Sequence, residues 1–310
     1  MAAVVAIYGP TASGKSALAV ALAHAIDGEV VSADSMQVYR GLERITNQPT
    51  VDERQGIAHH LVGCVDPRTD YDVVRYAADA HAAIDGILSR GRTPIVAGGS
   101  GLYLRAALAE LAFPPQAAAA ERAQAEELVE RIGAAAAHAR LAELDPAAAS
   151  RIDPADSRRI VRALELADRG ASLAPDGEDA LWAPTTRLPT RLFALAVDRA
   201  LLRTRIDART PRLLDDGGID EVAALLADPR PLSRTAAQAH GIDDIRALLA
   251  DEIDRAECER RLATRTRQYA KRQDTWRRRL PRLEEVPADG PAAQVARDIA
   301  ARLVGQPRYD

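Results

Sequence analysis

The stretch Gly9-Pro10-Thr11-Ala12-Ser13-Gly14-Lys15-Ser16 decides the fold of this chain. It follows an apolar run at residues 4–8, which predicts a strand, and leads into residues 17–23, which predict a helix. In that context the pattern G-x-x-x-x-G-K-[ST] predicts a cradle for a di- or triphosphate, because loop amides and a helix N-terminus attract anions. We expect Lys15 to reach the outer phosphate and the Ser16 hydroxyl to bind Mg²⁺. The alternative is a chance match in a chain rich in small residues.

The composition predicts a globular protein of one large domain or two. The chain has 310 residues, of which 47% are hydrophobic, and no apolar run approaches the ~20 residues of a membrane span. Its N-terminus lacks the pattern of a secretory signal. Cys64 and Cys258 are the only cysteines, which excludes a disulfide framework and a zinc finger built on several cysteines. We therefore expect a cytoplasmic protein that does not bind membranes.

The charge of the chain is unevenly distributed. The formal net charge is −4, but residues 255–282 carry eleven basic and three acidic side chains, and hence +8. A concentrated basic helix on an acidic body predicts a polyanionic partner, although a solvated charged helix is the alternative. Lys15 and Lys271 are the only lysines, so Lys271 marks a second place where an ammonium replaces the usual arginine.

Two further strands bring polar residues to the same edge of a parallel sheet. Residues 29–32 predict a strand followed by Asp34, which could be a site residue or a helix cap. Residues 93–97 predict a buried strand that runs into Gly98, Gly99 and Ser100 rather than into an acid. The missing acid disfavours an ordinary ATPase, and the glycines let another backbone or a substrate approach closely. His59 and His60 alternate across a strand, so we expect one ring to support the phosphate site rather than a metal pair.

The whole pattern predicts an α/β fold: a P-loop NTPase-like parallel sheet flanked by helices, with a mostly α-helical insertion domain. We place the first part of the core at residues 1–113, the insertion at 114–189, and the return to the core with basic helices at 190–310. Strands are expected at 192–197 and 283–286, and helices at 76–88, 199–214 and 254–279. In the last helix Leu262, Tyr269 and Trp276 recur every seven residues, which predicts one buried stripe.

These motifs together resemble the tRNA dimethylallyltransferases, in order and over nearly the whole chain. The resemblance rests on residues 9–16 and 32–41, His59-His60-Leu61, Asp66-Pro67, Gly98 to Tyr103, Arg158 to Glu165, Gln268 to Gln273, and Thr275-Trp276.

The resemblance implies transfer of a dimethylallyl group from dimethylallyl diphosphate to the exocyclic N⁶ amine of adenine 37 in tRNA. A diphosphate then leaves, so no acid is needed after the third strand. Asp34 would remove the amine proton, and Lys15, Thr11 and Arg205 would act with Mg²⁺ on the leaving diphosphate. The residues that the resemblance places against tRNA are Asp34, Ser35, Met36, Gln37, Ser100, Arg122, Arg158, Arg159, Ile160, Val161, Arg162 and Lys271. We expect the protein to act as a monomer.

The chain departs from the bacterial family pattern at three places. Ile45-Thr46-Asn47-Gln48 stands where most bacterial members have G-T-A-K, and Ser100 replaces a commoner Thr. His240-Gly241-Ile242-Asp243-Asp244 replaces I-G-Y-K-E, which puts a tRNA contact of that loop in doubt. Three alternatives stay open: an adenylate isopentenyltransferase acting on free AMP, ADP or ATP, a P-loop small-molecule kinase, and an RNA-binding protein with an inactive phosphate loop.

Overall fold

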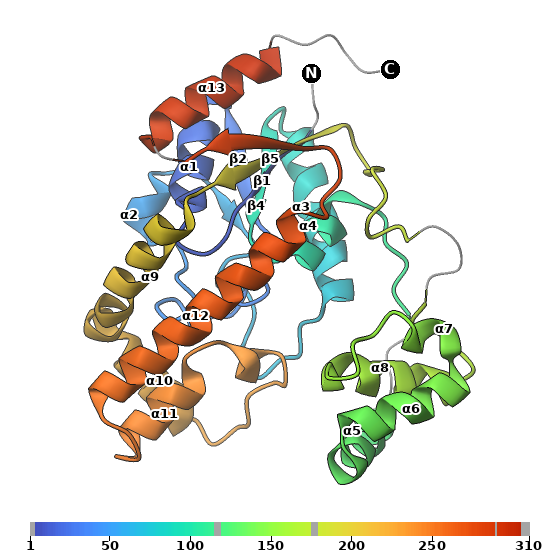
Figure 1. The fold of residues 1–310 in the computed structure, drawn as a ribbon. Coiled ribbons are helices and arrows are strands. Elements are labelled where there is room, and N and C mark those ends of the chain that lie inside the picture. Colours follow the sequence, from blue (N-terminus) through green and yellow to red (C-terminus); the bar gives the residue numbers. More distant parts are fainter. Residues whose placement is uncertain (1–3, 115–118, 175–178, 289, 305–310) are drawn as a thin grey trace. The chain divides into compact units, whose positions relative to one another are not determined.

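The computed structural model describes residues 4–114, 119–174, 179–288 and 290–304 (Figure 1). The chain divides into two compact units. The larger unit comprises Met1–Glu110 and Pro184–Asp310, and the smaller comprises Leu111–Ala183.

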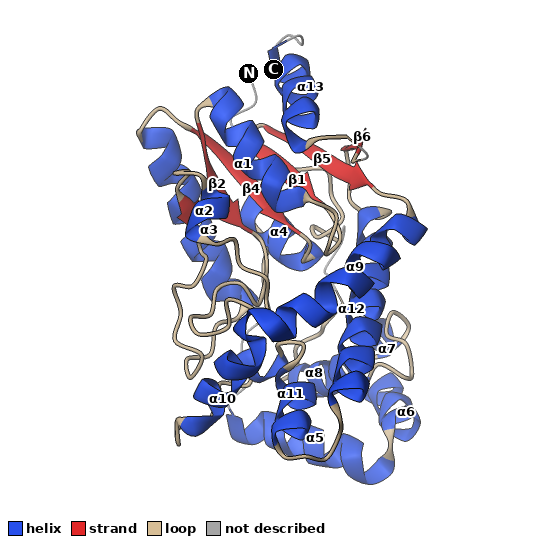
Figure 2. Ribbon diagram, turned by 90° about the vertical axis from the view of Figure 1, so that its left-hand side faces the viewer, coloured by secondary structure: helices blue, strands red, loops and turns tan. Residues whose placement is uncertain are grey.

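The larger unit is built on a parallel sheet, in which the described residues form six strands in the order β3-β2-β4-β1-β5-β6 (Figure 2). The strands are β1 (Val4–Tyr8), β2 (Gly28–Ser32), β3 (His59–His60), β4 (Thr93–Gly98), β5 (Thr190–Ala196) and β6 (Leu283–Pro287). Every residue of β1 and β2 is buried, as expected for a parallel sheet that is covered on both faces. The predicted fold class is confirmed.

Helices cover both faces of this sheet. On one face α1 (Lys15–Ile26) and α13 (Ala292–Val304) share a hydrophobic core with Val5, Ile7 and Phe193 of the strands. Two further helices, α3 (Val73–Ser89) and α4 (Gly101–Leu108), pack together and contact β4. A short helix, α2 (Val51–Arg54), precedes β3. No helix within the described ranges is long and apolar enough to cross a bilayer.

The order of the strands brings three loops to one edge of the sheet. β4 lies between β2 and β1, and Ser32 pairs with Ala97, which in turn pairs with Ile7. Because the three strands are parallel and level at their carboxyl ends, the loops that follow them meet. This edge therefore holds residues 9–14, the Asp34 loop, and the Gly98–Ser100 turn.

Two long helices border this edge. α9 (Arg199–Leu213) follows β5, and α12 (Arg255–Arg277) precedes β6; the two pack against each other (Figure 1). Between them in the chain lie a π-helical turn (Leu214–Gly218), α10 (Ile219–Ala227), a 3₁₀ turn (Ala236–Gln238) and α11 (Ile242–Leu249). Of the predicted stripe on α12, only Leu262 is fully buried, whereas Tyr269 and Trp276 are half-buried.

In the described part of the smaller unit all regular elements are helices. It contains α5 (Ala119–Ile132), α6 (Ala134–Leu144), α7 (Pro146–Ala149) and α8 (Ser157–Ala167). Its own core gathers buried residues from all four helices, among them Val129, Leu141, Ala148 and Ile160. A separate core of this kind explains why the unit is compact by itself.

One expectation about the histidines is wrong. His60 Nε2 lies 2.7 Å from Oε2 of Glu29, near the amino end of β2, and Glu29 also pairs with Arg90 at 2.7 Å. The ring therefore supports the far end of the strand and not the phosphate site. The adjacent His59 lies with its Nδ1 at 2.9 Å from the Ile57 carbonyl oxygen.

Candidate active site

The phosphate-binding loop joins β1 to α1 at the carboxyl edge of the sheet. Ala12 and Gly14 have positive φ angles of 63° and 90°. The Ser13 N–H donates to the Pro10 carbonyl oxygen at 3.2 Å, which closes the curl of the loop. A curled backbone that leads directly into a helix is the arrangement in which amides bind phosphate oxygens. The strand–loop–helix context predicted around residues 9–16 is present.

Two arginines of α9 reach this loop. Arg209 Nη2 donates to Thr11 Oγ1 at 3.0 Å, and burial lowers the pKa of its guanidinium. Arg205 Nη1 lies 3.4 Å and 3.5 Å from the carbonyl oxygens of Ala12 and Ser13. Arg205 was among the predicted residues, whereas Arg209 was missed. The i, i+4 spacing that puts it one turn further on the same helix face could have indicated it.

The Asp34 carboxylate acts on the charge of Lys15 in the phosphate loop. Burial lowers the pKa of the Lys15 ammonium, the Asp34 carboxylate raises it, and the Arg209 guanidinium lowers it again. Asp34 Oδ1 accepts the Met36 N–H at 2.9 Å, which fixes the carboxylate at the end of β2. Asp34 also acts on His240, whose pKa is lowered by burial and by neighbouring arginines but raised by this carboxylate. The site thus combines a cationic phosphate loop with one carboxylate.

Ser100 links the Asp34 loop to α12. Its Oγ accepts the Ser35 N–H at 3.4 Å and lies 3.1 Å from the Tyr269 hydroxyl. Burial, followed by the Asp34 charge, raises the pKa of Tyr269, so its hydroxyl stays protonated. The His240 ring packs edge-on against Tyr269, with ring centres 5.3 Å apart. Two aromatic rings therefore lie near Asp34, the predicted general base.

The side-chain amide of Gln37 forms hydrogen bonds within the segment that follows β2 and does not point outward. Its Oε1 accepts the Ser32 hydroxyl at 3.1 Å, and its Nε2 donates to the Asn47 carbonyl oxygen at 2.8 Å. Nearby, the buried Gln48 donates to the Tyr39 carbonyl oxygen at 2.7 Å. Of the unusual Asn47-Gln48 pair, the Gln48 side chain thus serves the internal structure of this segment, and Asn47 contributes its main-chain oxygen.

The glycines after β4 allow two other segments to approach closely, as predicted. A Cβ at Gly98 would lie 2.1 Å from the Ala33 carbonyl oxygen, next to Asp34. A Cβ at Gly99 would lie 2.1 Å from Nε2 of Gln273 on α12. Gln273 is almost completely buried, and its Oε1 accepts the Thr11 N–H at 2.8 Å. Sequence reasoning missed this residue as part of the site, because it could not place α12 against the loop.

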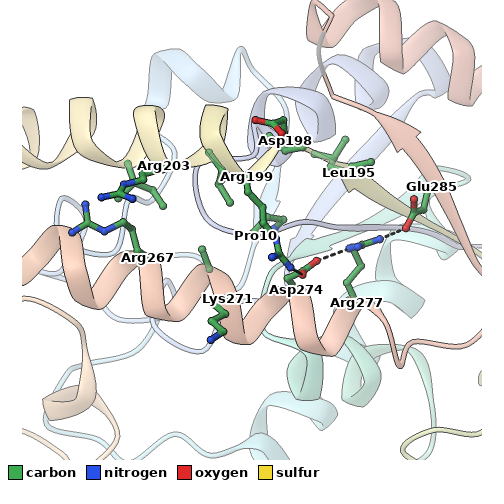
Figure 3. Close-up of a pocket in the computed structure, with 15 residues that line it drawn as sticks. Pro10, Leu195, Asp198, Arg199, Arg203, Arg267, Lys271, Asp274, Arg277 and Glu285 are labelled. Carbon is green, nitrogen blue, oxygen red and sulfur yellow. Dashed lines mark hydrogen bonds and ion pairs between the residues drawn. The ribbon is translucent and has the colours of Figure 1, made fainter.

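A cavity of about 680 Å³ lies between α9 and α12 and reaches the phosphate loop at Pro10 (Figure 3). Its wall includes apolar side chains, and its charged groups include Arg203, Arg267 and Lys271. Arg203 and Arg267 both pair with Asp207. Lys271 is exposed, and no ion pair engages it within the described chain. Its ammonium is thus available to an anionic partner.

Two of the predicted arginines of the smaller unit, Arg122 and Arg162, are positioned by a buried acid. The Glu165 side chain is fully buried and pairs with Arg162 Nη1 at 2.9 Å and with Arg122 Nη1 at 3.5 Å. Arg158 and Arg159 are exposed at the start of α8. Ile160 and Val161 lie in the core of this unit, so their side chains are not accessible to a nucleic acid. The helical period turns these two inward and corrects their place in the predicted tRNA-contacting set.

The third sequence departure lies where the chain enters α11. Asp244, where the family pattern has Glu, is buried and pairs with Arg265 of α12 at 3.0 Å. Asp243, where the pattern has Lys, pairs with Arg246 at 2.9 Å. The acidic residue at 243 is thus accommodated by a local partner.

Known proteins resemble this chain along most of its length. The family described as IPP transferase matches residues 37–280. A tRNA dimethylallyltransferase from Anaeromyxobacter dehalogenans is 46% identical over 282 residues, covering 89% of this chain and 90% of the relative. Another from Corynebacterium glutamicum is 41% identical over 291 residues, covering 94% and 96%.

Solved structures agree with these relatives. The tRNA isopentenylpyrophosphate transferase of Bacillus halodurans has a TM-score of 0.71 and 32% identity, covering 98% of this chain and 96% of its own. A eukaryotic dimethylallyltransferase described as acting on tRNA has a TM-score of 0.76 and 28% identity, covering 97% and 79%. The resemblance noted from the motifs is confirmed, and the chain belongs to the IPP transferase family.

Proposed function

We propose that this protein transfers the dimethylallyl group of dimethylallyl diphosphate to the N⁶ amine of adenine 37 in tRNA, giving N⁶-dimethylallyladenosine and diphosphate. The observation that carries the proposal is that the Asp34 carboxylate and the cationic phosphate loop meet at one edge of the sheet: the Gly9 N–H donates to the Gly98 oxygen at 3.2 Å, and the Ala33 N–H, next to Asp34, donates to the Ala97 oxygen at 2.9 Å. A loop for a leaving diphosphate and a base for the incoming amine are the two groups that this substitution needs.

The phosphate loop stabilises the leaving group. Negative charge grows on the diphosphate as its bond to the dimethylallyl carbon breaks. The Arg205 and Arg209 guanidiniums are held against the loop before the reaction by their contacts within the protein, and Lys15 stands beside them at the start of α1. Preorganised cations and amides act strongly on such developing charge, because they need not reorient during the step.

Asp34 acts on the nucleophile. The lone pair of the adenine amine is delocalised into the ring, so the amine attacks well only as its proton is removed. Asp34 Oδ1 is held by the Met36 N–H, and no hydrogen bond within the described residues engages Oδ2. Oδ2 can therefore accept the amine proton while the new C–N bond forms. The target base must leave its stack to reach this position, and the Tyr269 and His240 rings offer surfaces for it to stack on.

Mg²⁺ fits the donor set at this edge. Magnesium in phosphate sites takes one or two protein ligands and completes its shell with water and substrate oxygens. The Ser16 hydroxyl stands at the start of α1, and the described residues contain no cluster of three or more His, Cys, Asp or Glu that would form an all-protein site. When bound, the ion would neutralise diphosphate charge.

The tRNA contacts are proposed separately for each unit. In the larger unit the Asp34–Gln37 loop and Ser100 would meet the base, and Lys271 with the exposed arginines of α12 would meet backbone phosphates. In the smaller unit, Arg158 and Arg159, with the Glu165-bound Arg122 and Arg162, would contact the backbone. We further propose that the enzyme acts as a monomer in the cytoplasm, where tRNA is found.

The test supplies radiolabelled dimethylallyl diphosphate with a tRNA transcript that has adenine at position 37, with the same transcript carrying guanine there, or with AMP. We expect label only in the first. Label in AMP but not in tRNA would indicate an adenylate isopentenyltransferase, and ATP turnover without prenyl transfer would indicate a kinase.

The catalytic assignment has its own test. Asp34→Asn should lower the single-turnover rate by about 10²- to 10⁴-fold while tRNA affinity stays within roughly twofold. The matched control is Asp52→Asn, at an exposed acid on α2, which should transfer like the wild type. A near wild-type rate for Asp34→Asn would show that another group removes the proton.

A further inference from the structure

Gln273 lies where three parts of the site meet. It belongs to the last turns of α12, and its side chain is only 2% exposed. Its Oε1 accepts the Thr11 N–H of the phosphate loop at 2.8 Å. Its main-chain oxygen accepts the hydroxyl of Tyr8, the last residue of β1, at 2.9 Å. Gly99 completes this junction, because its missing side chain leaves the space that the Gln273 amide fills.

The other half of the same amide is unused. Nε2 of Gln273 is buried, and no hydrogen bond reaches it within the part of the chain that the structure describes. Buried polar groups are normally paired, since an unpaired amide has lost its water without compensation. Tyr269 lies four residues earlier on the same face of α12, which brings its hydroxyl within reach of the Gln273 side chain. Burial raises the pKa of that hydroxyl, and the Gln273 side chain lowers it in part.

A hydrogen bond from Gln273 to Tyr269 would determine which group donates in the hydrogen bond between Tyr269 and Ser100. With its oxygen accepting from Nε2, the Tyr269 hydroxyl must donate to Ser100 Oγ, 3.1 Å away. Ser100 Oγ also accepts the Ser35 N–H at 3.4 Å. Its own hydroxyl hydrogen is then left to donate to another acceptor.

We propose that Gln273 is a positioning residue for the transfer reaction, joining the phosphate loop to the wall that receives the acceptor base. Oε1 holds the Thr11 amide in place for the diphosphate. Nε2 closes onto Tyr269 when the site is occupied, and the chain Gln273–Tyr269–Ser100 fixes the hydroxyl that faces the base. The inference rests on the proposed function for the identity of the acceptor base. The predicted effect of Gln273 on diphosphate binding does not depend on that function.

The experiment compares two substitutions. Gln273→Met keeps the length of the side chain and removes both the Oε1 acceptor and the Nε2 donor, whereas Tyr269→Phe removes only the hydroxyl through which Nε2 would act. We expect Gln273→Met to weaken binding of inorganic diphosphate roughly tenfold and also to lower kcat at saturating donor. Tyr269→Phe should lower kcat and leave diphosphate affinity unchanged, and the double variant should lower kcat no further than Gln273→Met.

The control is Gln268→Met, at an exposed glutamine on the same helix, which should match the wild type in each measurement. Thermal melting and tRNA binding are measured for every variant, so that a loss of folding is told apart from a loss of function. Unchanged diphosphate affinity in Gln273→Met, or effects of the two substitutions on kcat that simply add, would overturn the proposal. Should Gln273→Met fail to fold, an unaltered kcat in Tyr269→Phe overturns it alone. Failure of the wild type to modify tRNA would instead refute the proposed function, because diphosphate binding is measured without transfer.

Discussion

Gly98→Ala tests the closest approach between two segments of the site. The new Cβ would lie 2.1 Å from the Ala33 carbonyl oxygen and 2.5 Å from its carbonyl carbon. Carbon–oxygen contacts are normally about 3.3 Å or longer, so the two segments must separate by roughly 1 Å. Both clashing atoms are backbone, and the Ala33 N–H is bound to the Ala97 oxygen at 2.9 Å. Neither side can therefore yield by a simple rotamer change.

The expected cost follows from this geometry. Overpacking of a filled interior costs about 1–3 kcal/mol, and we expect a value near the upper end, because no flexible side chain absorbs the clash. Ala33 directly precedes Asp34, so a shift of roughly 1 Å also misplaces the base, which can lower the rate about 10²-fold. Urea unfolding measures the first effect, and single-turnover transfer to tRNA measures the second.

Gly86→Ala provides the matched control for this substitution. Gly86 lies within α3, where a Cβ would meet only the Arg90 side chain at an ordinary 3.4 Å. The same change should therefore stabilise the protein by roughly 0.5–1 kcal/mol and leave transfer intact. A Gly98→Ala protein with wild-type stability and rate would falsify the packing described for this turn.

Two further outcomes are expected. Arg209→Gln should weaken the binding of inorganic diphosphate by about tenfold or more in a calorimetric titration, because a charged donor is lost from the loop. The control is Arg212→Gln, at an exposed arginine on the same helix, which should bind diphosphate like the wild type. Equal affinities of the two variants would show that Arg209 is not part of the site. Burial lowers the pKa of His240 in the folded protein, so the unfolded chain binds more protons at this residue. Stability is therefore lost as the pH falls below about 6.5, the ordinary histidine pKa, and through the pKa of the folded state. His240→Gln should lack this part of the acid loss in urea unfolding at pH 7.5 and 5.5, and an identical pH dependence in both proteins would contradict the assignment.

Local patterns predicted much of the fold because they depend on neighbours in the chain. The apolar run before Gly9 and the small residues after Ser16 required a strand and a helix, and the structure has β1 and α1 there. Continuous apolar runs also located β2, β4 and β5 to within two residues. Asp34 and the Gly98–Ser100 turn could be assigned to one edge, because parallel strands bring their carboxyl ends together.

Other features depended on contacts between distant segments. Gln273 lies 262 residues from Thr11 in the chain, and no local pattern indicates that its amide meets that N–H. In the sequence nothing distinguishes Arg209 from the other arginines of its helix. It reaches Thr11 only because α9 lies against the phosphate loop in the folded protein. One ring of the His59-His60 pair was expected to support the phosphate site, but the strand pairing of β3 brings the His60 ring to Glu29 instead.

The sequence by itself determined the phosphate loop, the parallel sheet that presents it, and the carboxylate after the second strand. These follow from hydrophobic periodicity and from backbone chemistry over a few consecutive residues. Only the tertiary structure decided how α12 closes on the loop, which arginines of α9 reach Thr11 and its neighbours, and which side chains of α8 are buried. Those outcomes depend on how helices pack across the sheet edge and within the smaller unit, where a shift of one helical turn would exchange the buried residues for exposed ones.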